Sequence, residues 1–220
     1  MGHLGLGFCY KTHSFWADHD DIFLNKAHHH GLQLAQIAPD ASQTWRLLSR
    51  TYCGMGKWDE AWSGAQRALS IDPSDGDIIG NRGVYHIFNG EPIIAMEWFN
   101  KVLELHSDTP QTLDIMRYWQ ALALFTANDF ATAATLLRSV SGHDFIRAEL
   151  LAACHSWLGQ IDEARAQADA ALKMYPALRA GDVRLWRSFR NEIDRQNLLS
   201  ALREAGLPEQ RCFPIFHPLR

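Results

Sequence analysis

Three consecutive histidines, His28, His29 and His30, are the most obvious candidates for metal binding in this sequence. Imidazole nitrogens are common ligands of zinc, so such a run suggests a metal site. Adjacent residues on a helix, however, point about 100° apart, so three in a row cannot share one ion. The positions one turn further along hold Gln33 and Leu34, where further ligands would have to lie. We therefore expect these histidines on a solvated helix surface, and we predict neither a metal site nor a cofactor.

Two short patterns resemble catalytic motifs without meeting their requirements. Residues 54–57, Gly-Met-Gly-Lys, resemble the end of a phosphate-binding loop, but Thr51 replaces the first glycine and Trp58 the hydroxyl that binds magnesium. Cys154 and His155 could supply a nucleophile and a base, but neighbouring side chains on a helix diverge. We therefore predict that the chain is not an enzyme.

Arginines alternate with aromatic residues near the C-terminus, a pattern that can bind nucleic acid or a membrane surface. The net charge of the chain is −4, and no wider basic field supports these arginines. We expect instead a helix whose aromatic side chains pack on the protein and whose arginines face water, with no nucleic-acid partner and no membrane insertion. The residues concerned are Arg184, Trp186, Arg187, Phe189 and Arg190.

The composition indicates a folded chain in a reducing compartment. Of the 220 residues, 47% are hydrophobic and 21% are charged, which is enough to form a core. No apolar run approaches the roughly 18 residues of a membrane span, and residues 1–5 lack the features of a signal peptide. The four cysteines are scattered and form no C-x2-C pair, so we expect reduced thiols and a cytoplasmic location.

A regular repeat in the sequence predicts the helices that carry the candidate residues described above. Alanines recur along the chain at intervals of 34, 34, 38 and 31 residues. A repeat of this length predicts a solenoid in which each helical hairpin buries its apolar side against its neighbours. The alanines, each expected near the start of the second helix of a hairpin, are Ala27, Ala61, Ala95, Ala133 and Ala164.

The clearest repeat, residues 42–75, resembles a tetratricopeptide repeat (TPR). Trp45, Leu48, Ser49 and Tyr52 follow the spacing W-x2-L-G/S-x2-Y of its first helix, and Pro73 ends its second helix. The resemblance implies an all-α fold, a TPR α-solenoid of about five helical hairpins over residues 1–177, followed by a C-terminal helical cap at 178–208 and a loosely ordered tail at 209–220. The expected units cover about residues 3–41, 42–75, 76–109, 110–143 and 144–177, with the first helix of the first unit at about 4–16.

A narrower resemblance concerns the end of this array. Residues 202–209, Leu-Arg-Glu-Ala-Gly-Leu-Pro-Glu, follow the pattern L-R-x-A-G-L-P-E. This segment resembles the one that closes the C-terminal TPR region of many bacterial class III adenylate/guanylate cyclases, which are signalling enzymes. Related arrays follow winged-helix DNA-binding domains in some transcription regulators. The resemblance implies a cyclase or regulator domain as a partner, while the cyclase catalytic core has no counterpart in this sequence.

The concave face of a TPR array usually binds its ligand, and the first helix of each unit lines that face. By repeat register this face is basic in the second unit and apolar to aromatic beyond it. A matching ligand would be a peptide or helix of another protein with an acidic end and an apolar run. The same apolar residues could instead be core, an alternative that the spacing leaves open. The predicted contact residues are Arg46, Arg50, Val84, Phe88, Tyr118, Leu122, Phe125 and Trp157.

TPR domains that grip the acidic tails of chaperones use a clamp of lysine, asparagine and arginine side chains. Arg46, Arg50 and Asn81 occupy three of the clamp positions, but Ile115 and Trp119 replace the remaining basic residues. We therefore do not expect binding to chaperone tails. The leading hypothesis is a non-catalytic protein–protein interaction module. The alternative is the regulatory C-terminal half of a bacterial nucleotide cyclase or winged-helix regulator whose effector domain is absent from this chain.

Overall fold

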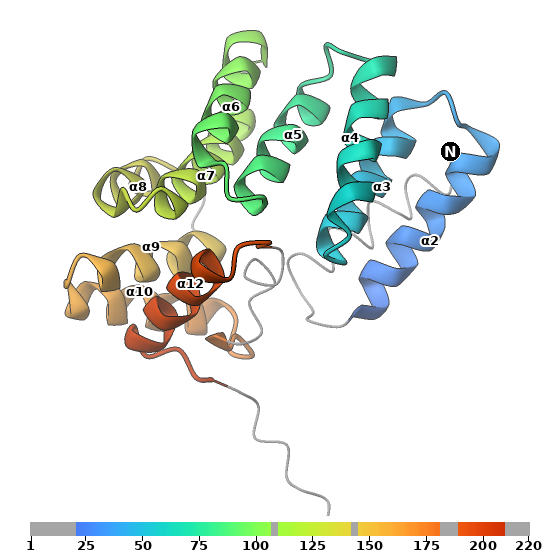
Figure 1. The fold of residues 1–220 in the computed structure, drawn as a ribbon. Helices are drawn as coiled ribbons and strands as arrows, with labels where there is room; N and C mark the ends of the chain where they lie inside the picture. The colour runs from blue at the N-terminus through green and yellow to red at the C-terminus, as the bar shows by residue number, and fades with distance from the viewer. Residues whose placement is uncertain (1–20, 107–109, 142–144, 181–188, 210–220) are drawn as a thin grey trace, which may run out of the picture.

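The computed structural model describes residues 21–106, 110–141, 145–180 and 189–209. In these ranges the chain forms ten α-helices and no β-strand, which confirms the predicted all-α class (Figure 1). The helix expected at 4–16, residues 184–188 of the arginine–aromatic segment and the tail beyond residue 209 lie outside the described residues. The helices are α2 (Asp21–Ile37), α3 (Ser42–Gly54), α4 (Trp58–Ile71), α5 (Gly76–Phe88), α6 (Pro92–His106), α7 (Pro110–Thr126), α8 (Phe130–Arg138), α9 (Phe145–Trp157), α10 (Ile161–Met174) and α12 (Glu192–Glu204).

Short turns of one kind join these helices into hairpins, pairing α3 with α4, α5 with α6, α7 with α8 and α9 with α10. In each turn the middle residue has a positive φ, between 63° and 80°. The N–H of the next residue then donates to the carbonyl five positions earlier, at 2.8–2.9 Å. Glycine suits this backbone because it has no Cβ, and asparagine tolerates it better than most residues. The four middle residues are Gly56, Gly90, Asn128 and Gly159.

Small residues allow the two helices of a hairpin to approach closely. Between α3 and α4, Ser49 is buried and its hydroxyl donates to the carbonyl of Ala61 at 2.7 Å. Gly64 on α4 faces the same serine, and a Cβ at Gly64 would lie only 3.1 Å from the Cβ of Ser49. All five alanines of the repeat are completely buried. The period read in the sequence therefore marks where the helices of each hairpin cross.

The hairpins follow one another around an arc, and α12 packs against α9 near its end (Figure 1). A continuous hydrophobic core runs from α5 through α10 to α12 and includes the fully buried rings of Phe99 and Phe125. Two hydrogen bonds tie α12 to α9. Ser156 Oγ donates to the carbonyl of Ala201 at 2.9 Å, and Trp157 Nε1 donates to the carbonyl of Asn197 at 3.1 Å.

Residues 202–209 end α12 with a defined local geometry. Gly206 has a φ of 91°, and the N–H of Leu207 donates to the carbonyl of Leu202 at 3.0 Å. Both leucines are buried, which is the apolar contact that usually accompanies this type of helix end. The carbonyl of Pro208 then accepts a hydrogen bond from the N–H of Ala180 at 2.9 Å. This turn thus connects the end of α12 to the chain that leaves α10.

Candidate functional site

The basic part of the predicted binding face lies on α3 and α5. Arg46 on α3 forms an ion pair with Asp77 on α5. Arg50, one turn further along α3, is half-buried and has no carboxylate of the described residues within ion-pair distance. Burial, together with the nearby charge of Arg46, lowers the pKa of Arg50 to about 10. The guanidinium of Arg50 is therefore charged at neutral pH but poorly hydrated.

Asn81 on α5 belongs to the same part of the face. Arg46 and Asp77 are 31 residues apart, and so are Arg50 and Asn81, so from this equal spacing we infer that Asn81 lies near Arg50. Asn81 is 7% exposed, and its Nδ2 has no hydrogen-bond partner among the described residues. Leaving such a donor unpaired costs about 1–3 kcal/mol. A carboxylate that approached Arg50 and reached this buried amide would accept hydrogen bonds from both side chains.

The apolar part of the predicted face is buried. Its members belong to one hydrophobic core cluster and are at most 8% exposed. A ligand therefore finds little of their surface to contact, which favours the alternative that these residues are core. The residues are Val84, Phe88, Tyr118, Leu122 and Phe125.

The segment just before α12 covers part of this apolar stretch. The ring of Phe189 lies edge-on to the ring of Phe88, with 5.3 Å between their centroids. The N–H of Arg190 donates to the carbonyl of Phe88 at 2.8 Å, and its guanidinium donates to Asn89 Oδ1 at 3.1 Å. The open apolar groove expected beyond the second unit is thus filled here by the protein's own chain. A ligand would reach Phe88 only if residues 189 and 190 moved away.

Trp157, the last predicted contact residue, is 44% exposed at the end of α9. Its ring stacks on that of Phe130 on α8, with 5.4 Å between centroids and 8° between planes. Its indole N–H is already used in the bond to Asn197. Trp157 therefore has a structural role in joining α8, α9 and α12, and it still presents part of one ring to solvent.

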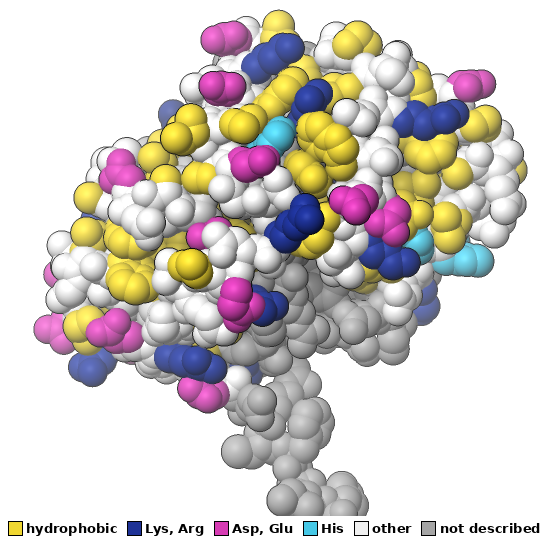
Figure 2. Space-filling view, in the orientation of Figure 1, with side chains coloured by type: hydrophobic (Ala, Val, Ile, Leu, Met, Phe, Trp, Pro, Cys, Tyr) yellow, Lys and Arg dark blue, Asp and Glu magenta, His cyan; other side chains and the backbone are white. Residues whose placement is uncertain are grey.

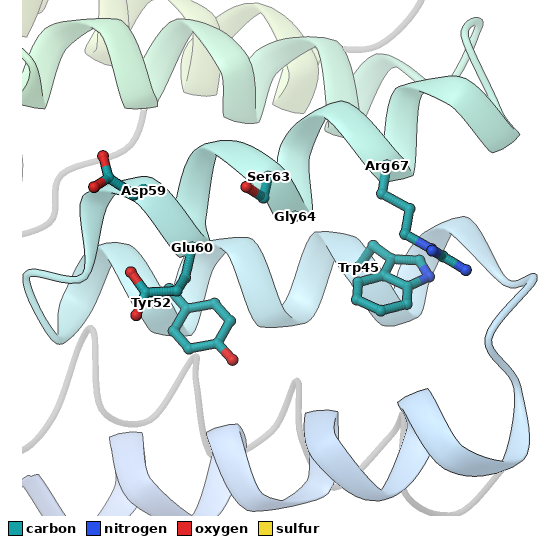
Figure 3. Close-up of a pocket in the computed structure, with 7 residues that line it drawn as sticks. All are labelled: Trp45, Tyr52, Asp59, Glu60, Ser63, Gly64 and Arg67. Atoms are coloured by element: carbon teal, nitrogen blue, oxygen red, sulfur yellow. The ribbon is translucent and has the colours of Figure 1, made fainter.

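A hollow of about 390 Å³ opens between α3 and α4 (Figure 3). Tyr52 and Glu60 lie together at one end, and the guanidinium of Arg67 lies 4.3 Å from the ring centroid of Trp45 at the other. Because one end is acidic and the other basic, the hollow has no single charge preference. Its lining comprises Trp45, Tyr52, Asp59, Glu60, Ser63, Gly64 and Arg67.

Sequence reasoning missed this hollow because it used Trp45 and Tyr52 only to identify the first helix of the repeat. The available signal was Gly64, which has no side chain at a position where the next unit, 34 residues later, has Trp98. The mid-helix glycine thus indicated both a close helix crossing and missing volume on the surface.

The histidine and cysteine side chains that suggested a metal site or a catalytic pair in the sequence make packing contacts and hydrogen bonds within the protein. His28 Nδ1 lies 3.0 Å from Thr51 Oγ1, and the His28 ring meets that of Tyr52 edge-on. Burial raises the pKa of the Cys154 thiol to about 12, so almost no thiolate forms at neutral pH. His155 bonds through Nδ1 to Gln160 Oε1 at 2.6 Å. Within the described ranges, no group of three or more histidine, cysteine or acidic side chains could hold a metal ion.

Solved structures with the same fold identify the architecture. The crystal structure of PilW, a type IV pilus biogenesis factor, matches with a TM-score of 0.65 and 18% identity over 92% of this chain and 88% of that chain. TTC0263, a TPR protein of Thermus thermophilus, matches with a TM-score of 0.65 and 14% identity over 91% of this chain and 97% of that chain. A TPR protein of Parabacteroides merdae matches with a TM-score of 0.60 and 14% identity over 91% of this chain and 83% of that chain. The fold is a TPR α-solenoid.

These similarities establish the TPR fold and leave the ligand open, because all three identities are low. No family model matches the sequence, and no curated protein matches it either. None of the three solved structures is described as a nucleotide cyclase, so the cyclase resemblance continues to depend on residues 202–209. Among the described helices of this TPR solenoid, none is long and apolar enough to cross a membrane.

Proposed function

We propose that this chain is a protein-interaction module that binds a peptide or helix of another protein and catalyses no reaction. The TPR solenoid supports the interaction role in general terms. One observation carries the more specific proposal. The half-buried Arg50 and the buried Asn81 are hydrogen-bond donors on the inner helices, and the described residues supply no acceptor for the Asn81 Nδ2 amide and no ion-pair partner for Arg50.

The chemistry of this pair selects an acidic ligand. A carboxylate would neutralise the poorly hydrated guanidinium of Arg50 and accept a hydrogen bond from the amide of Asn81. One group would thus compensate both the desolvation of the charge and the unpaired donor. The neighbouring Arg46–Asp77 ion pair lies one turn away and adds polar contacts at the same end. The apolar run of the ligand would extend toward Phe88 and displace Phe189 from it. We therefore expect a peptide with acidic residues at one end and apolar residues at the other.

The alternative proposal concerns the larger protein in which such a chain would act. Residues 202–209 support a role as the regulatory C-terminal region of a bacterial nucleotide cyclase or of a winged-helix transcription regulator. In that case the partner is a cyclase or regulator domain, and the array transmits a binding event in a signalling pathway. A cytoplasmic location fits both versions, because the described cysteines, Cys53 and Cys154, are buried free thiols.

Comparative capture tests the proposal before a partner is known. Purified wild-type chain, the Arg50→Gln variant and the Arg165→Gln variant would be immobilised at equal density, and bound proteins quantified by mass spectrometry. Arg165 is an exposed arginine on α10, so its variant controls for the loss of one positive charge. We expect the wild type and Arg165→Gln to capture the same proteins and Arg50→Gln to lose a subset of them. Identical capture by all three chains would place the binding site elsewhere.

A further inference from the structure

A stack of aromatic and basic side chains joins α4, α5 and α6. The guanidinium carbon of Arg82 lies 4.7 Å from the ring centroid of Trp62 and 4.3 Å from that of Trp98. Arg82 on α5 is therefore held between two indole rings, one from each flanking helix. Lys101 Nζ lies 5.3 Å from the Trp98 centroid, and the ring of Tyr85 lies 4.7 Å from that of Trp62. Figure 2 shows basic side chains among hydrophobic ones over this part of the molecule.

Arg82 has no counter-ion among the residues that the structure describes. No carboxylate of the described chain lies within ion-pair distance of it, and its Nε is buried without a hydrogen-bond partner there. Burial alone lowers the pKa of Arg82. The guanidinium has thus lost hydration and gained two aromatic faces, but its Nε–H has no acceptor in the described part of the protein.

The two indoles determine how Arg82 can bind a ligand. Rings on both sides of a planar guanidinium cover its faces and leave only its edge, where the N–H donors point. Arg82 as a whole is half-buried, so this edge reaches solvent at its terminal nitrogens. A planar edge with parallel donors matches the two oxygens of a carboxylate. Lys101 supplies a second positive charge beside the same stack.

We propose that Arg82, clamped between Trp62 and Trp98, is a docking site for a carboxylate side chain on an acidic peptide segment of a partner protein. This site consists of residues other than Arg50 and Asn81, so it does not depend on the function proposed above. Charge complementarity selects the partner, because Arg82 and Lys101 are two neighbouring cations without an ion pair to any described residue. A nucleic acid fits less well, since it requires a broad basic field that this surface does not have.

A purely structural role for Arg82 does not account for its unmet hydrogen-bonding capacity. A leucine occupies the corresponding position of the preceding unit, Leu48, and packs there without any polar group. An apolar residue would join α4, α5 and α6 without the cost of desolvating a charge. The presence of arginine at this position is explained if the uncovered edge of its guanidinium, where the N–H donors point, binds an anion.

Nuclear magnetic resonance can test this without a known partner. An acetylated, amidated tetraglutamate peptide would be titrated into the full-length chain, with the indole N–H signals assigned through Trp62→Phe and Trp98→Phe. We expect saturable shifts of the Trp62 and Trp98 indoles and of the Arg82 Nε–H, with the Trp157 indole unmoved and the binding weakened by added salt. A parallel titration with an oligothymidine strand should produce no comparable shift. No peptide-induced shift at these signals, or shifts with the oligonucleotide alone, would overturn the proposal.

Variants separate the site from general charge effects. Arg82→Gln should weaken peptide binding by about tenfold or more, the size of one charge-assisted hydrogen bond. Lys101→Gln, a surface change that leaves the stack intact, should weaken it several-fold. Arg165→Gln and Arg50→Gln should leave the shifts at Trp62 and Trp98 unchanged, which distinguishes this site from the inner face. Should Arg82→Gln fail to fold, the wild-type shifts and Lys101→Gln still decide the matter, and equal affinity in Lys101→Gln and wild type would contradict the proposal.

Discussion

Two glycines on α5, three residues apart, have different surroundings at the scale of single atoms. A Cβ at Gly83 would lie 2.4 Å from Cε1 of the fully buried Phe99, well within van der Waals contact distance. A Cβ at Gly80 would lie 3.5 Å from Met116 Cε, which is an ordinary contact. Alanine is favoured over glycine within a helix by about 1 kcal/mol. At Gly83 the clash with Phe99 should therefore outweigh the gain in helix propensity. At Gly80 there is no such clash, so the gain in helix propensity should remain.

We predict that Gly83→Ala lowers the free energy of unfolding by about 1–3 kcal/mol, the usual cost of overpacking a core. Gly80→Ala, the matched control, should raise it by up to about 1 kcal/mol. Urea unfolding followed by circular dichroism measures both. Equal effects of the two substitutions would mean that Phe99 does not pack on Gly83 as described.

Glu149 on α9 makes stability depend on pH. It is 4% exposed, and burial raises its pKa to about 8 from an ordinary value of 4.5. Between these two values the folded protein keeps a proton on Glu149 that the unfolded chain has lost. Raising the pH through this window therefore weakens the folded state, and above about pH 8 the carboxylate is buried with its charge.

We predict that Glu149→Gln stabilises the protein at pH 8 by on the order of 2 kcal/mol and has little effect at pH 5. The quantity to compare is the difference in unfolding free energy between variant and wild type at each pH, because other groups titrate equally in both. A difference that stays constant from pH 5 to pH 8 would show that Glu149 is solvated.

At the scale of elements, α12 is held by a hydrogen bond from a buried serine. Ser156 Oγ donates to the carbonyl of Ala201, which also accepts the N–H of Ala205 at 3.0 Å, so the loss of the serine hydroxyl removes one of the two hydrogen bonds to this carbonyl. Ser156→Ala should cost about 1 kcal/mol of unfolding free energy. Ser200→Ala is the control, because Ser200 is exposed and its hydroxyl bonds only within α12. Thermal unfolding of both variants tests the packing, and equal melting temperatures would argue against it.

Removal of the whole segment tests whether it acts as the predicted cap. A chain ending at residue 188 loses the buried Leu198, Leu199 and Leu202 and exposes the helix faces that they cover. We expect a loss of several kcal/mol and a tendency to aggregate, given about 25 cal/mol per Å² of apolar surface exposed. A truncated chain that remains monomeric with an unchanged melting temperature would show that α12 is not a cap.

Elements that depend on local signals can be predicted from the sequence. Glycine and asparagine mark the turns because a positive φ is a property of one residue, and the alanine period marks the helix crossings because each repeats the same contact. The covering of Phe88 was not predictable in this way. It depends on Phe189 and Arg190, which are 101 and 102 positions away, and no repeat relates them to α5. The Trp62–Arg82–Trp98 stack likewise combines residues of two units, which an analysis of each repeat by itself does not compare.

The whole molecule is a TPR α-solenoid, for which we propose binding surfaces and no reaction centre. Its inner face is partly filled by the segment before α12, and the two donors of the proposed ligand site, Arg50 and Asn81, lie on α3 and α5. Purified protein incubated with ATP or GTP should accordingly form no cyclic nucleotide, because no described group of side chains could hold the metal ions that such chemistry needs. Chromatographic detection of a cyclic product would contradict this.

The central claim is that an acidic ligand binds at Arg50 and Asn81. The most direct measurement is a calorimetric titration of the captured partner's binding segment into wild type, Arg50→Gln, Asn81→Leu and Arg165→Gln, with folding of each variant verified. The account predicts a loss of about tenfold or more in affinity for the first two variants and unchanged affinity for Arg165→Gln. Equal affinity of all four chains would contradict it.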